Sequence, residues 1–175
     1  MAATFEYNED NGAQTGSPLK GTVRNTAVTQ VNWKNVDDVA TAYTSSPITA
    51  GANSFSKYQF GKFTGTFNQI SAALWAHTAG VLGTGLTLKG AVTSTYATPT
   101  TTAVAAFSTD MTSVIAIGSG ATVLFGITGP EQTSPTSTLA VPGFTQYLGT
   151  QLQTTVSAAA GDIGSITLTL RYNEN

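Results

Sequence analysis

The chain has 175 residues, charged residues make up 9% of it, and its formal net charge at pH 7 is -2. About a quarter of the residues are charged in an ordinary soluble domain, so acids and bases are scarce here. With one histidine and no cysteine, most catalytic and zinc-binding constellations cannot be assembled. The seven lysines and arginines are spread along the chain, so there is no electrostatic reason to expect nucleic-acid binding, which relies on clustered basic residues.

The length and the N-terminus predict a single domain. A chain of this size buries enough surface to fold without disulfides or metals, and we expect neither a metal nor a cofactor. We predict one β-sandwich domain over residues 21–175, preceded by an N-terminal strand or arm over residues 1–20. The first ten residues do not have the basic start and apolar stretch of a secretory signal, and no window approaches the roughly 18 apolar residues of a membrane span. We therefore expect a protein made in the cytoplasm that binds no membrane.

The N-terminal segment is polar and rich in turn-forming residues from Glu6 to Lys20, with only Phe5 and Tyr7 available to anchor it. One interpretation is an arm that docks on a neighbouring subunit through main-chain pairing and these aromatic side chains. The other is a first strand followed by a long surface loop of the same domain.

Alternating polar and apolar residues predict a series of short strands. The clearest runs from residue 163 to residue 172, where the even positions from Ile166 to Tyr172 are apolar and the odd positions are Ser, Thr or Arg. The other candidates, in chain order, are residues 4–7, 27–33, 55–67, 85–96, 113–117, 121–127 and 146–156. Glycine-containing turns are expected at 11–12, 51–53, 83–85, 118–120, 129–130 and 161–162.

Two short segments also have helical features. Residues 35–43 begin with Asn35 as an N-cap and carry Asp37 and Asp38 in the first turn, while residues 69–77 end before Gly80. A short helix is therefore an alternative prediction for each segment.

About eight short strands without long helices predict an all-β fold, an antiparallel two-sheet β-sandwich of the jelly-roll or Ig-like type. Threonine suits this fold because its branched side chain packs on a pleated surface and its hydroxyl keeps the outer face polar without charge. Few lysines are present to protect the strand edges from pairing with another molecule. Ordered assembly, in which partners cover those edges, would remove this hazard.

The polar residues form no recognisable catalytic motif, and we predict that the protein is not an enzyme. His77 follows Trp75 in the sequence, and we interpret it as a structural residue. The adjacent acids Glu9-Asp10 and Asp37-Asp38 are better explained by turn chemistry than by calcium binding, since they lack the ligand spacing of an EF-hand loop. Tandem acids also do not flank a sugar ring as glycoside hydrolysis requires.

Aromatic side chains are the remaining candidates for binding. We predict that Phe5, Tyr7, Tyr58, Phe60 and Phe63 include residues that face an interface or a glycan. The last three do not share one strand face. The pattern therefore predicts either a bulge near Gly61 or an aromatic side chain that faces outward.

A resemblance adds to this interpretation. The runs 31–35, 50–58 and 60–67 and the ending 161–174 resemble those of small Thr/Gly-rich virion structural proteins of tailed bacteriophages. The likeness consists of strand and turn patterns rather than a diagnostic motif. It implies a β-sandwich and a role in the particle, and it implies no catalytic or ligand-binding residue.

These observations lead to one functional hypothesis and two alternatives. The first is a capsid decoration (cement) protein, located in the virion, that binds the major capsid protein or other virion proteins and forms homo-oligomers. The second is a neck, tail or fibre component of the same particle. The third is a carbohydrate-binding or adhesin module, which would need exposed aromatic side chains. The first hypothesis also predicts exposed faces that are more apolar than a monomer tolerates.

Overall fold

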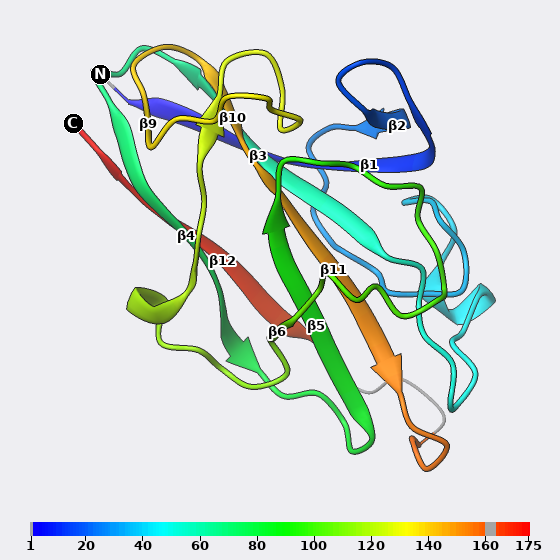
Figure 1. Cartoon of the computed structure of the whole chain (residues 1–175). Helices are drawn as coiled ribbons and strands as arrows, with labels where there is room; N and C mark the ends of the chain where they lie inside the picture. The colour runs from blue at the N-terminus through cyan, green and yellow to red at the C-terminus, as the bar shows by residue number, and fades with distance from the viewer. Residues whose placement is uncertain (1, 160–163) are drawn as a thin grey trace.

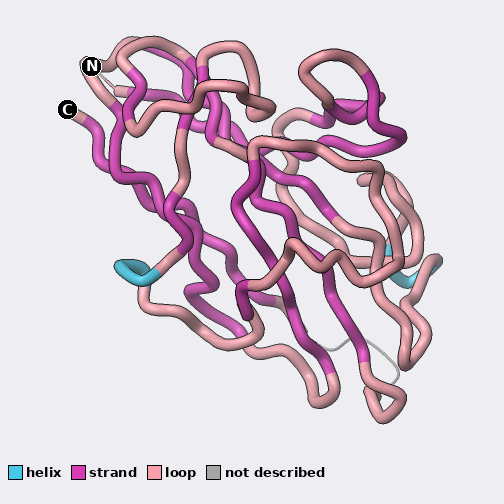
Figure 2. Tube along the Cα trace, viewed as in Figure 1, coloured by secondary structure: helices cyan, strands magenta, loops and turns pink. Residues whose placement is uncertain are grey.

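The computed structural model describes residues 2–159 and 164–175. They form two antiparallel sheets that pack face to face (Figure 1), so the predicted all-β, two-sheet sandwich is confirmed. Helical structure in the described ranges is limited to two short 3-10 turns, η1 (Tyr43–Ser45) and η2 (Ile117–Ser119), and loops make up much of the rest (Figure 2). None of the helices described is long and apolar enough to cross a membrane.

The larger sheet, sheet A, has eight strands. They are β1 (Ala3–Thr15), β2 (Lys20–Asn25), β3 (Lys57–Gly65), β5 (Leu86–Thr93), β6 (Thr109–Asp110), β8 (Phe125–Gly126), β10 (Gly143–Thr145) and β11 (Tyr147–Thr154). Their order is β2-β1-β3-β11-β5-β6, with β10 paired to β3 and to β8. The centre of this sheet is therefore β3 and β11, with the N-terminal strand directly beside them.

The smaller sheet, sheet B, has four strands. They are β4 (Ile70–Gly80), β7 (Ala121–Thr122), β9 (Thr138–Leu139) and β12 (Ile166–Glu174). β12 pairs with one side of β4, and the two short strands pair with the other side. β12 is thus an edge strand along its whole length.

A hydrophobic core fills the space between the sheets. Its buried members come from both sheets and the loops between them: Phe63, Phe67, Ile70, Ala73, Trp75, Leu86, Leu88, Met111, Val123, Phe125, Leu139, Leu148 and Leu152. Burial of one large apolar side chain contributes about 1.5–3 kcal/mol, so this core is the main source of stability.

A second aromatic cluster covers the opposite face of sheet A. It contains Tyr58, Phe60, Tyr96, Phe107 and Tyr147. The chain between β5 and β6 provides two of these rings, and Phe107 packs where Gly149 has no side chain, since a Cβ there would lie 2.4 Å from its ring. Both faces of the centre of sheet A are therefore buried.

This double burial explains the aromatic run of β3. The pairing of β3 with β1 is continuous from residue 3 to residue 10 of β1, so the predicted bulge near Gly61 is absent from this pair. On its other side, β3 pairs with β10 and β11, and there the register shifts by one residue opposite Gly61, with the extra residue in the partner. The alternative, an aromatic side chain facing outward, is wrong. Phe63 packs in the inner core, whereas Tyr58 and Phe60 pack in the outer cluster on the other face.

The polar N-terminal stretch is a strand rather than a free segment. β1 pairs with β3 through residues 3–10 and with β2 through residues 9–15, with an irregularity between Asn11 and Gln14. The turn predicted at Asn11-Gly12 is therefore a distortion within a strand, where Gly12 has a φ of 84°. β1 therefore pairs with β3 along its first part and with β2 along its later part, and the two ladders overlap at Glu9 and Asp10.

Both predicted helices are wrong. In the segment 69–77, all residues from Ile70 onward lie in β4, because pairing with β12, β7 and β9 outweighs the local preference for a helix. Residues 35–43 form bends that lead into η1. There the side chain of Asp38 accepts hydrogen bonds from the backbone and hydroxyl of Thr41, which stabilises a local turn in competition with a helix.

Three of the predicted strands also differ. Residues 27–33 contain no strand, and Ala27 has a φ of 53° that a strand does not adopt. Residues 113–117 form bends and the start of η2, while residues 121–127 contain only the short β7 and β8. The turn predicted at 161–162 lies outside the described residues.

Candidate functional site

The aromatic residues predicted to face a partner are mostly buried. Tyr58, Phe60 and Phe63 are at most 2% exposed, so their prediction as contact residues is wrong: both faces of β3 are covered. Tyr7 is partly buried against Trp75, with ring centroids 5.7 Å apart. Phe5 alone of the predicted set is appreciably exposed, at 38%.

His77 is fully buried in β4. Its ring nitrogens each lie 2.8 Å from a carbonyl oxygen, that of Met111 for Nδ1 and that of Ala79 for Nε2. The contact with Met111 attaches β4 to the loop after β6, whereas the contact with Ala79 lies within β4. The ring thus has the structural environment that the sequence analysis expects.

The adjacent acids of β1 lie on opposite faces of sheet A. Successive side chains of a strand point to opposite faces, so Glu9 faces the inner core and Asp10 faces the outer aromatic cluster. Both are at most 1% exposed. Each is the centre of a separate cluster of polar side chains, which we call the inner polar cluster and the outer polar cluster.

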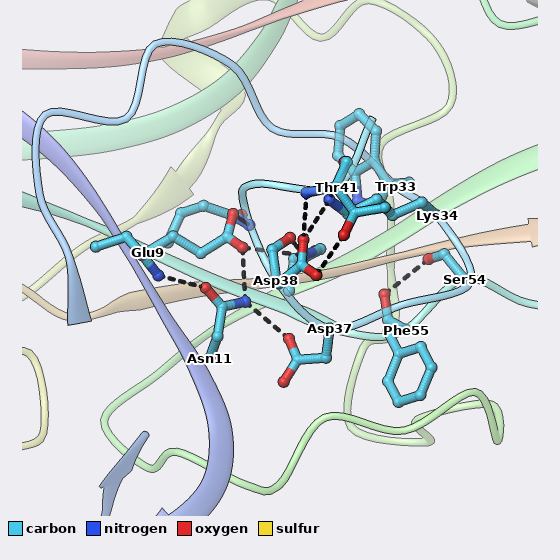
Figure 3. Close-up of polar contacts among 12 residues, drawn as sticks. Glu9, Asn11, Trp33, Lys34, Asp37, Asp38, Thr41, Ser54 and Phe55 are labelled. Atoms are coloured by element: carbon cyan, nitrogen blue, oxygen red, sulfur yellow. Dashed lines mark hydrogen bonds and ion pairs between the residues drawn. The ribbon is translucent and has the colours of Figure 1, made fainter. Parts of the chain in front are cut away.

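The inner polar cluster joins β1, β3 and the loop after β2 (Figure 3). Glu9 Oε1 accepts a hydrogen bond from Lys57 Nζ at 3.0 Å and another from Asn11 Nδ2 at 2.8 Å. Asp37 Oδ1 also accepts from Asn11 Nδ2, at 2.7 Å, and Asn25 Nδ2 donates to Asn11 Oδ1, at 2.7 Å. Because its nitrogen meets two carboxylates, the orientation of the Asn11 amide is determined by its partners.

A second ion pair lies next to it. Lys34 is fully buried, and its Nζ lies 2.8 Å from Asp38 Oδ1. The hydrogen bond from Lys34, with further bonds from Thr41, holds the pKa of the Asp38 carboxyl well below its usual range. Lys57 contacts Asp38 only at the main-chain oxygen, at 3.1 Å. The Asp38 carboxylate therefore neutralises Lys34, and Glu9 neutralises Lys57.

The outer polar cluster is built around an arginine. Arg24 binds both carboxylate oxygens of Asp10, at 2.8 and 2.7 Å, and it also lies 3.1 Å from Glu131 Oε2. Tyr147 Oη donates to Asp10 Oδ2 at 2.5 Å. Burial raises the pKa of Tyr147, and the neighbouring Asp10 raises it further. The loop that carries Glu131 is thereby attached to the outer face of the sheet.

Neither cluster is predicted from the sequence. Glu9 and Asp10 are conspicuous as adjacent acids, but nothing in the local pattern indicates that Lys57, Arg24 or Glu131 lies near them. The only indication in the sequence is the small number of charged residues. A lysine or arginine that is buried needs a carboxylate as its partner, and this chain offers few of them.

The described residues contain no group of three or more His, Cys, Asp or Glu that could hold a metal ion. The hollow beside Arg24, about 540 Å³ in volume, is open and polar and is lined mainly by residues 24–32. It contains no arrangement of nucleophile and base. The two polar clusters thus consist of paired charges and hydrogen bonds that connect elements of the fold.

The edge of β12 is an accessible feature that could bind a partner, as are the shorter edge strands β2 and β6 of sheet A. Among the described residues, the backbone of β12 pairs with β4 on one side and with no strand on the other. Two register shifts interrupt this ladder, but the extra residue lies in β4 each time, so β12 itself is continuous. Ile166, Leu168, Leu170 and Tyr172 are only partly buried against the core, and Phe5 lies beside Tyr172 with ring centroids 6.3 Å apart.

Comparison with protein families, with curated proteins and with solved structures gives no match for this chain.

Proposed function

We propose that this chain is a non-enzymatic structural protein of a bacteriophage particle, a decoration protein that binds the outside of the capsid and stabilises it. The observation that carries the proposal is the unpaired edge of β12. It is nine residues long, it is bordered by half-buried apolar side chains, and Arg171 is its only basic residue. Such an edge accepts a further strand through main-chain hydrogen bonds.

Two other observations support a binding role. Large apolar side chains are exposed at several points of the surface, among them Val81, Val114, Ile127 and Val156, each more than 50% exposed. The polar groups that resemble an active site, in contrast, are buried in ion pairs. In this proposal the partners are the major capsid protein and neighbouring copies of the same chain.

The test is binding to undecorated capsid shells. We expect the purified protein to co-sediment with the shells and to raise the temperature at which they break. Failure of both would contradict the proposal, and binding at only a few copies per particle would instead indicate a neck, tail or fibre component.

A matched pair of variants tests the role of β12. Thr167 and Asn173 are exposed on the outer face of this strand, and Thr133 and Ser134 are exposed on a distant loop. Lysines on an edge strand oppose pairing, so T167K/N173K should bind shells less tightly than T133K/S134K, which has the same net charge. Equal binding by the two variants would exclude β12 as the contact.

A further inference from the structure

We infer that the inner polar cluster is the site of a covalent cross-link: an amide bond between Lys57 Nζ and Asn11 Cγ, formed with Glu9 as the proton carrier. The inference concerns the chain itself and does not depend on the partner proposed above. It rests on three side chains that are each at most 3% exposed.

The first observation is proximity. Lys57 Nζ and Asn11 Nδ2 contact the same oxygen atom, Glu9 Oε1, at 3.0 and 2.8 Å, so the two nitrogens lie less than about 6 Å apart. The register of β1 and β3 pairs Asp10 with Tyr58 and so places Asn11 opposite Lys57. Groups held this close in a rigid sheet react as parts of one molecule at high effective concentration.

The second observation is burial. A lysine becomes a nucleophile when it loses its proton, and a water-free environment favours this because charged groups are poorly stabilised there. The nearest base is the Glu9 carboxylate. Proton transfer from Lys57 to Glu9 converts a buried ion pair into a neutral amine and a neutral acid, which the interior accommodates more readily.

The third observation is the environment of the Asn11 amide. Asn25 Nδ2 donates a hydrogen bond to Asn11 Oδ1 at 2.7 Å. A donor at this position stabilises the negative charge that develops on the oxygen when the carbonyl is attacked. On the other side, Glu9 and Asp37 both contact Nδ2, the nitrogen that would leave.

The reaction balances without any added reagent. Glu9 removes a proton from the Lys57 ammonium, and the free amine attacks Asn11 Cγ. The Nζ–Cγ bond forms and the Cγ–Nδ2 bond breaks as Glu9 passes a proton to the departing nitrogen. Ammonia leaves as a neutral molecule, and Glu9 keeps the extra proton of the lysine, so that no unpaired charge stays buried. The product is a neutral amide between β1 and β3.

One competing reaction has the same mass change. An Asn-Gly sequence can lose ammonia when the following backbone nitrogen attacks the side chain and forms a succinimide. In this fold the Gly12 nitrogen donates a hydrogen bond to Asp37 Oδ2 at 2.6 Å, which holds it away from that attack. The experiment must nevertheless separate the two products.

The test is mass spectrometry of the full-length, folded and then denatured protein. We expect the intact mass to be lower than the calculated mass by one ammonia. Trypsin should then fail to cut after Lys57, and residues 1–20 should be recovered joined to residues 35–62. A full intact mass would overturn the inference, and so would a loss of ammonia with normal cleavage after Lys57, which indicates the succinimide.

Variants assign the roles of the residues. E9Q keeps the size of the side chain but removes the base, and K57R keeps the charge but removes the nucleophile, so both should have the full calculated mass. K34R changes the other buried lysine and should still lose ammonia. Circular dichroism would confirm that each variant is folded. A joined peptide in folded E9Q would exclude Glu9 as the proton carrier.

Discussion

The two polar clusters on either side of β1 stabilise the same strand by different means. The inner polar cluster pairs Glu9 with a lysine at 3.0 Å and leaves both side chains at most 1% exposed. The outer polar cluster pairs Asp10 with Arg24 through two parallel hydrogen bonds, and 29% of the Arg24 side chain remains exposed. Water can therefore compensate for a lost partner on the outer face but not on the inner face.

The comparison also shows why the two cations differ. Arginine can bind one carboxylate through two donors. Its remaining donors can bind a second acid, which here is Glu131. Arg24 also lies 4.8 Å from the centre of the Phe60 ring, which adds a cation–π contact. Lysine is a single flexible donor that loses its proton more readily when buried. This difference is the reason why only the inner polar cluster is reactive in the inference above.

The largest effect is expected for K57M. It removes one member of a buried ion pair, which costs about 3–5 kcal/mol, or, in chains that carry the proposed cross-link, it removes the bond between β1 and β3. K34M is the control, because Asp38 is 38% exposed and can be hydrated when its partner is lost. Urea unfolding followed by circular dichroism should show the larger loss for K57M. Equal losses would mean that exposure of the remaining acid does not determine the cost.

Removal of the outer cation is the next test. R24L leaves Asp10 and Glu131 without their shared partner, and we expect a loss of about 3 kcal/mol, at the lower end of the range for broken buried pairs, because the site is open to water on one side. R24K keeps the charge but not the two parallel bonds, so it should lose less. The same urea experiment measures the stability of both variants. If R24L lost more stability than K57M, the outer polar cluster would be the one that depends more on its cation.

A smaller effect is expected for Y147F. The hydroxyl of Tyr147 donates to Asp10 at 2.5 Å, and loss of a buried hydrogen bond to a charged group costs about 1–3 kcal/mol. The control is Y172F, since no hydrogen bond of the Tyr172 hydroxyl is found in the described part of the chain. Thermal unfolding should separate the two variants. If Y172F were as destabilised as Y147F, the hydrogen bond to Asp10 would not explain the loss.

The smallest effect is expected at an exposed ion pair. Hydrogen bonds from Thr112, and then Lys89 at 3.1 Å, lower the pKa of Asp110 to about 2. Ionised Asp110 therefore stabilises the fold above about pH 4, the pKa of an unfolded Asp, and this contribution is lost as the pH falls toward 2. Since 57% of the side chain is exposed, D110N should cost less than about 1 kcal/mol at pH 7.

The measurement for D110N is the unfolding temperature as a function of pH. The difference between the variant and the original protein should be present at pH 7 and should shrink between pH 4 and pH 2, the interval from the unfolded to the folded pKa. A difference that does not change with pH would show that the charge of Asp110 is not its cause.

Individual residues show which parts of the fold the sequence could predict. The sequence predicts β12 because its alternation is local and uninterrupted, whereas over β4 it predicts no strand and only a possible short helix at residues 69–77. Local pattern cannot include the pairing of β4 with β12, which is separated from it by about ninety residues. The aromatic run of β3 is hard to interpret for a related reason: alternation assumes that one face is exposed to water, whereas here the core between the sheets covers one face and a loop covers the other.

Composition and alternation by themselves determined that this chain is an all-β protein with few charges and with no conventional catalytic motif. These properties follow from residue types and from spacing along one strand, and both are visible in a single chain segment. The tertiary structure alone decided that Glu9 meets Lys57, that Asp10 meets Arg24, and that the edge of β12 stays open. The two ion pairs join residues that are 14 and 48 positions apart in the sequence. The order of the strands brings these residues together, and alternation does not encode strand order.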